Sequence, residues 1–126
     1  MGNDYPRSQR VGDQIQRELA ELIRAEVRDP RVRQVTVSEV EVSRDLAHAN
    51  VYVTGLGMAA EDSRAMATVL DGAAGFLRRQ LARRLRLRTV PALHFHYDPV
   101  FDRGARLNEL IEQAVSGDGA SGAEQD

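Results

Sequence analysis

The chain has 126 residues and a formal net charge of −2, and all 17 of its basic residues are arginine. It contains no cysteine, which excludes disulfides and thiolate metal sites. No apolar run approaches the roughly 18 residues of a membrane span, and the first residues lack the apolar stretch of a signal peptide. We therefore expect a cytoplasmic protein that does not enter membranes.

The length predicts one folded domain. We expect this domain over residues 8–115, between a flexible N-terminus of residues 1–7 and a disordered tail of residues 116–126. Glycine, serine, alanine and acidic residues dominate the tail, and such a composition cannot bury enough apolar surface to order it.

The first expected element is a helix from Ser8 to Arg28. Its apolar residues recur at helical spacing: Val11, Ile15, Leu19, Leu22, Ile23 and Val27. Ser8 is the predicted N-cap. Pro30 ends the helix, because a proline disfavours helical geometry at the preceding residue, Asp29.

Two strands follow, at residues 34–43 and 47–54, joined by a short turn. The valines of the first strand change phase between Val37 and Val40, so an unbroken strand would point them to both faces. A β-bulge at Ser38-Glu39 would restore one apolar face, and we predict one there. The hairpin then has a single apolar face, which helices must cover.

A second helix is expected from about Ala60 to a Gly-Ala-Ala-Gly joint at residues 72–75, and a third from the joint to about Arg88. Leu77, Leu81 and Leu85 form the apolar stripe of the third helix. A strand at residues 92–97 and a last helix from Asp102 or Ala105 to Val115 complete the chain. This order predicts a single α+β domain in which helices cover a three-stranded sheet, the arrangement of K-homology (KH) domains of the type II, αββααβ, kind.

The segment from Arg78 to Arg88 is the main candidate for a functional surface. It holds no acidic residue, while the rest of the chain sets eleven arginines against nineteen acidic residues, or −8. Its six arginines repel one another unless an anion is present, and guanidinium groups bind phosphate oxygens in a planar fork. The segment therefore predicts contact with a polyanion, through a helix face that carries Arg79, Arg83 and Arg86 opposite the leucines.

The joint points to nucleic acid. In KH domains a Gly-x-x-Gly turn brings the backbone close to phosphates. Residues 72–75 match this pattern, but the middle pair, Ala73-Ala74, lacks the usual basic residue, so we expect a tight kink rather than an extended loop. Phe76 is the only nearby ring, which favours recognition of RNA backbone and shape over stacked bases.

Other chemistries find less support in the sequence. His94 and His96 share a face of the third strand near His48, and two histidines at this spacing can ligate a metal, but no cysteine or carboxylate partner accompanies them. We expect hydrogen-bonded strand residues instead. No nucleophile stands beside a base, which disfavours a phosphate-ester hydrolase that would use Arg and His. We expect no enzyme, metal or cofactor; a protein–protein adaptor with an acidic partner is the alternative.

Several short segments stand in order over about residues 7–111: Arg10-Val11 with Gln14-Ile15, Asp29-Pro30-Arg31, residues 40–46, residues 49–53, residues 73–78, and residues 90–93 with Phe95. As a series, they resemble the bacterial ribosome-binding factor A family. In that family an Ala-x-Gly kink replaces the Gly-x-x-Gly loop, and Ala73-Ala74-Gly75 fits this kink.

The resemblance implies a function that spacing alone does not give. Members of the family bind the small ribosomal subunit late in assembly, contact its 16S rRNA, assist maturation of the rRNA ends and leave afterwards. Release is linked to assembly GTPases, and assistance at low temperature is typical. We expect a monomer when free, and the resemblance implies that Ala73 and Gly75 form the kink. The implied rRNA-binding residues are Arg78, Arg79, Arg83, Arg84, Arg86 and Arg88, with Arg7, Arg10, Arg31, Arg33 and Arg44 as secondary candidates.

Overall fold

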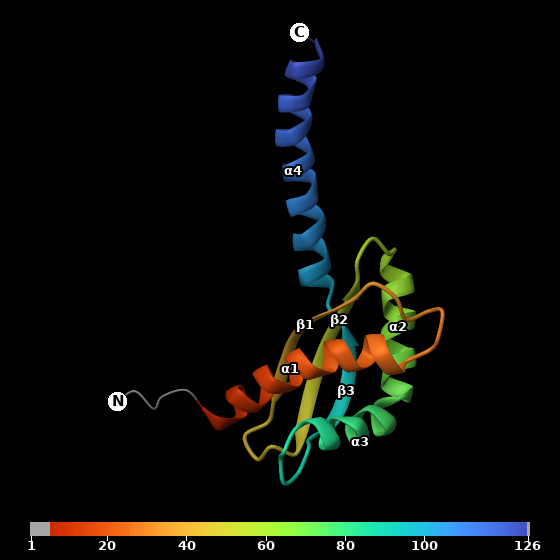
Figure 1. Ribbon diagram of the computed structural model, residues 1–126, viewed down its shortest axis with the longest axis vertical. Coiled ribbons are helices and arrows are strands. Elements are labelled where there is room, and N and C mark those ends of the chain that lie inside the picture. The colour runs from red at the N-terminus through yellow and green to blue at the C-terminus, as the bar shows by residue number, and fades with distance from the viewer. Residues whose placement is uncertain (1–5, 126) are drawn as a thin grey trace.

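Three strands form one sheet in the order β1-β2-β3 (Figure 1). The computed structural model describes residues 6–125. Its elements are α1 (Arg7–Glu26), β1 (Val35–Val42), β2 (His48–Gly55), α2 (Ala60–Gly72), α3 (Ala74–Arg84), β3 (Ala92–Tyr97) and α4 (Pro99–Gln125). β1 pairs antiparallel with β2, and β2 pairs parallel with β3. A parallel pair needs a crossover connection, which α2 and α3 supply.

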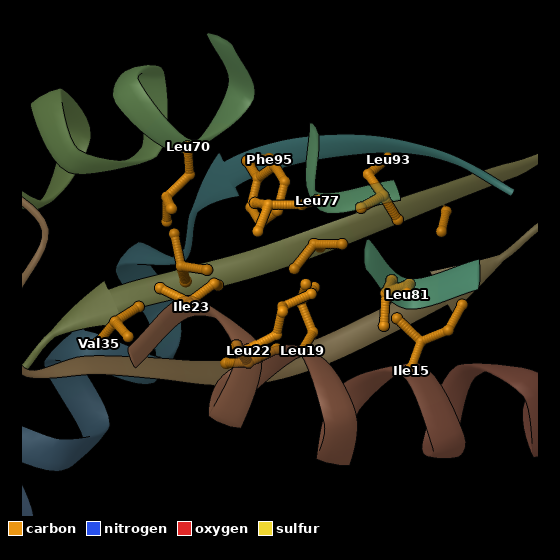
Figure 2. Close-up of a cluster of buried hydrophobic side chains, with 14 of the residues drawn as sticks. Ile15, Leu19, Leu22, Ile23, Val35, Leu70, Leu77, Leu81, Leu93 and Phe95 are labelled. Atoms are coloured by element: carbon orange, nitrogen blue, oxygen red, sulfur yellow. The ribbon is translucent and has the colours of Figure 1, made fainter. Parts of the chain in front are cut away.

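The core lies between the sheet and the first three helices, whereas α4 extends away from the body (Figure 1). Figure 2 shows side chains from α1, α2, α3, β1 and β3 pointing toward one another. The fully buried members include Ile15, Leu19, Leu22, Leu70, Leu77 and Leu81. The helical stripes predicted for α1 and α3 are therefore the faces that pack on the sheet. Element order and topology confirm the predicted α+β fold of the KH-like αββααβ type.

The predicted β-bulge in β1 is confirmed. The pairing with β2 shifts between Val37 and Glu39, which leaves Ser38 outside the regular register. The Ser38 hydroxyl donates to a carboxylate oxygen of Asp98 at 2.7 Å. With the extra residue, Val37 stays buried and Val40 still packs against the core, so both halves of the strand present their valines to the same side.

The ends of α1 differ slightly from the prediction. Ser8 is not the N-cap: Pro6 holds that position, and its carbonyl accepts the N–H groups of Gln9 and Arg10, both at 3.1 Å. The helix ends at Glu26, before the predicted Arg28, since the next residue already has extended geometry. Of the N-terminal segment predicted to be flexible, residues 1–5 lie outside the described residues, and Arg7 is helical.

The third helix ends at Arg84 rather than at the predicted Arg88. Leu85 turns to extended geometry (φ −99°, ψ 130°) while its N–H still donates to the Leu81 carbonyl at 2.7 Å. Leu85 is buried, and Leu87 packs partly against the core. The extended path keeps these two leucines on the apolar side, so burial has overridden the helical pattern. Arg86 and Arg88 consequently lie in the α3–β3 connection.

The last helix begins at Pro99 and continues to Gln125, through the segment for which a disordered tail was predicted. No proline follows Pro99 to interrupt it. Its start is tied to the body: the Tyr97 hydroxyl donates to the buried Asp102 at 2.7 Å, and Arg106 donates to the Met58 carbonyl at 2.6 Å. Among residues 6–125, no helix is long and apolar enough to cross a membrane.

Candidate nucleic-acid interface

The joint between α2 and α3 is one residue long. Ala73 alone separates the two helices, with φ −96° and ψ 9°. Its N–H contacts the carbonyls of Val69 (3.2 Å) and Leu70 (3.0 Å), and its own carbonyl accepts the Leu77 N–H at 2.9 Å. The N–H and the carbonyl of Ala73 are thus hydrogen-bonded within the two helices, so no extended loop separates them. The predicted tight kink is confirmed.

Neither glycine of the joint is required by the backbone there. A Cβ added at Gly72 would meet nothing within 4 Å, and one at Gly75 would meet only the Arg79 Nη1 at 3.6 Å. What fixes the joint is its packing, because Ala73 and Ala74 both contact the core. Asp71, just before the joint, accepts the Phe95 N–H at 2.8 Å and so ties α2 to the edge strand β3.

Two of the six candidate arginines are engaged within the molecule. Arg84 Nη1 lies 3.3 Å from a carboxylate oxygen of Glu18 and 3.1 Å from one of Glu21. Arg78 Nε donates to the Val90 carbonyl at 2.9 Å. These contacts hold α3 against α1 and against the segment that leads into β3. Arg84 is therefore the weakest of the six candidates for an external anion.

The other four arginines form what we call the arginine surface: Arg79, Arg83, Arg86 and Arg88. All four are exposed, and none forms an ion pair with the side chains of residues 6–115, which are the ones described. Arg79 and Arg83 are one helical turn apart on α3. Arg86 and Arg88 alternate with the inward-facing Leu85 and Leu87 in the extended connection. Helix and connection thus supply guanidinium groups that can meet phosphates without first breaking an internal contact.

The fold divides the secondary candidates between the two ends of the sheet. Arg7 begins α1, and Arg44 is exposed in the β1–β2 turn, at the end where the α3–β3 connection runs (Figure 1). Arg31 and Arg33 lie in the α1–β1 connection, at the opposite end. Arg31 pairs with Asp29 at 2.8 Å, and its hydrogen bonds lower the pKa of Asp29 to about 2. Arg10 has an interaction of its own within the chain.

The histidines lie on the sheet face that the first three helices leave open. His48 Nδ1 and His94 Nε2 are 3.0 Å apart, and His96 Nε2 is 2.9 Å from the Asn50 Oδ1. They are hydrogen-bonded strand residues, as expected. In the part of the chain that the structure describes, no group of three His, Cys, Asp or Glu could hold a metal ion.

Comparison with known proteins identifies the family to which the chain is similar. The model of the family described as ribosome-binding factor A matches residues 7–111. A ribosome-binding factor A of Alkalilimnicola ehrlichii is 63% identical over 118 residues, covering 94% of this chain and 91% of that protein. One of Thioalkalivibrio sulfidiphilus is 59% identical over 127 residues, covering 100% and 97%.

Solved structures agree. The crystal structure of ribosome-binding factor A from Thermus thermophilus is 34% identical with a TM-score of 0.62, covering 71% of this chain and 93% of that one. A homology model of the Thermus thermophilus protein, fitted into a cryo-EM map of a 30S–RbfA complex, is similar with a TM-score of 0.55 and 34% identity, covering 69% and 88%.

Proposed function

This chain belongs to the ribosome-binding factor A family, and from this premise we propose that it binds the small ribosomal subunit through 16S rRNA late in subunit assembly. The observation that carries the proposal is the arginine surface, four exposed guanidinium groups that form no ion pair with any side chain of residues 6–115. A relative fitted into a 30S complex shares this fold. Folded rRNA carries one negatively charged phosphate per nucleotide, so several phosphates can lie close enough together to contact the four arginines at once.

The proposed mechanism is binding without a catalytic act. A protein that binds one rRNA conformation more tightly than another shifts the population toward the first by the difference between the two affinities. The kinked α2–α3 pair is suited to this, because its packed joint holds Arg79 and Arg83 in a fixed relation to the sheet. Four phosphate contacts would give a slope of log affinity against log salt of about −3 to −4.

Further parts of the proposal rest on the family alone. We propose that the protein assists maturation of the 16S rRNA ends, supports assembly at low temperature, and is released in a step linked to an assembly GTPase. We also propose that it acts in the cytoplasm and is a monomer when free. Ala73, packed against the core, would set the angle at which α3 meets the rRNA, and Gly75, in the first turn of α3, would leave the backbone there accessible.

The test is co-sedimentation with purified small subunits in a sucrose gradient. The double variant Arg79→Glu/Arg83→Glu should remain in the top fractions while the wild type migrates with subunits. Arg28→Glu/Arg103→Glu carries the same charge change on exposed residues outside the arginine surface and should still co-sediment. Equal co-sedimentation of both variants would refute the assignment. Association that survives ribonuclease treatment would favour the alternative, an adaptor that binds an acidic protein.

A further inference from the structure

A small cavity opens beside the arginine surface. It has a volume of about 280 Å³ and lies where the start of α1, the β1–β2 turn and the α3–β3 connection meet. Its lining is Arg7, Val11, Asp45, Leu46, Ala47, Leu87, Arg88 and Thr89. Arg88 belongs to both the cavity and the arginine surface, so a molecule bound to the surface reaches this opening. The joint at Ala73 lies at the other end of α3, so this cavity is separate from the kink.

The walls are apolar and held in place. Val11 is buried, and Leu46 and Leu87 pack partly against the core. Leu46 has φ +62°, a left-handed conformation that is uncommon for a bulky residue and that persists only when its surroundings enforce it. Here the Leu46 N–H donates to the Ser43 carbonyl at 2.9 Å, and Asp45 accepts the Ser43 hydroxyl at 2.7 Å. The turn therefore holds Leu46 in a strained conformation, and in this conformation its side chain lines the cavity together with Leu87.

The rim of the cavity is cationic. Arg7 and Arg88 are exposed, and neither forms an ion pair with the side chains described, those of residues 6–115. Among the described lining residues the acidic group is Asp45, which accepts the Ala47 N–H at 3.1 Å; the two arginines outnumber it, so the lining has a net positive charge. An apolar cavity whose lining also includes two arginines is complementary to a nucleotide, whose base has apolar faces and whose phosphates are anionic. The faces of a base are apolar enough to pack against aliphatic side chains, so no aromatic ring is required.

We propose that this cavity takes one unstacked nucleotide of the bound RNA, with its base against Leu46 and Leu87 and its phosphates between Arg7 and Arg88. The inference rests on the proposed function, since it places a single-base contact at the edge of a surface that otherwise meets phosphates. It adds a preference for RNA in which one nucleotide is free to leave the stack, such as a bulge or a loop, over continuous duplex.

The test fills the cavity without changing any charge. Ala47→Phe puts a ring where the base would lie; Ala47 is exposed, and its backbone contacts to Asp45 and Ala92 do not involve its side chain. Ala65→Phe, on the exposed side of α2, is the matched control. The probes are a short RNA duplex and the same duplex with one unpaired nucleotide, followed by fluorescence anisotropy. Circular dichroism checks that each variant is folded.

Wild type and Ala65→Phe should bind the bulged RNA at least about 5-fold more tightly than the duplex, the order expected when a base buries apolar surface against aliphatic side chains. Ala47→Phe should bind both RNAs equally, with an unchanged salt slope. Equal binding of the two RNAs by the wild type, or a preference retained in Ala47→Phe, overturns the inference while leaving the arginine surface intact. Undiminished binding of both RNAs by Arg79→Glu/Arg83→Glu would instead overturn the proposed role of the arginine surface.

Discussion

Two adjacent arginines should respond in opposite ways to truncation. Arg84 lies between Glu18 and Glu21, at 3.3 and 3.1 Å, with side chains that are 31%, 38% and 65% exposed. Pairs this exposed contribute about 0.2–1 kcal/mol each. Because one guanidinium serves both carboxylates, its side-chain entropy is lost once, and we expect Arg84→Ala to lower the free energy of unfolding by about 1 kcal/mol. Arg83 has no such partner among the described residues, so Arg83→Ala should leave stability unchanged.

The binding effects should be the reverse. If Arg83 contacts a phosphate, Arg83→Ala makes the slope of log affinity against log salt less steep by about 1, whereas Arg84→Ala leaves that slope as it is. Urea denaturation gives the stabilities, and anisotropy with labelled RNA at several salt concentrations gives the slopes. The stability cost of Arg84→Ala should also shrink in high salt, which screens the pair. If Arg84→Ala made the salt slope less steep and left the stability unchanged, the division of the six arginines into internally bonded and RNA-binding residues would be refuted.

Three further predictions follow from individual side chains. Leu77 is fully buried, so Leu77→Ala should lower the free energy of unfolding by about 2–5 kcal/mol in urea denaturation. Gly72→Ala should raise it by about 0.5–1 kcal/mol, because the added methyl meets nothing and the residue is helical; a loss of stability would show that the joint needs its flexibility. Burial raises the pKa of Asp102, but hydrogen bonds from Tyr97 and Arg106 outweigh burial and leave it below the ordinary value of 3.8. The ionised Asp102 therefore stabilises the fold above pH 3.8, and this stabilisation is lost as the pH falls through the lowered pKa. In acid titrations, the difference in free energy of unfolding between wild type and Asp102→Asn should shrink to zero below pH 3.8.

Much of the fold was predictable because local pattern and burial agree. The α1 stripe at Val11, Ile15 and Leu19 becomes the buried face, and the phase change between Val37 and Val40 places the bulge. The resemblance to ribosome-binding factor A was readable from short segments in order, and the comparisons confirm the family.

The remainder depends on contacts distant in sequence. Arg84 meets Glu18 across 66 residues, so nothing in the local arginine run distinguishes it from Arg83. The early end of α3 follows from the burial of Leu85, a tertiary effect that the four-residue leucine spacing conceals. The left-handed backbone of Leu46 has no signal in its residue type, since a positive φ there is imposed by the turn. The binding residues themselves remain predictions.

The shape of α4 has a consequence for every thermal melt of this protein. Its first turns are tied to the body through Asp102 and Arg106, but beyond them Leu107, Leu110 and Val115 are 59%, 62% and 68% exposed. A helix end with so few buried contacts frays well below the temperature at which the core melts. Far-ultraviolet ellipticity should therefore begin to decline early. In a Tyr5→Phe/Tyr97→Phe variant, where Tyr52 in the sheet is the remaining tyrosine, the tyrosine signal should stay flat until the core melts, so two probes will report two transitions from a chain with one core.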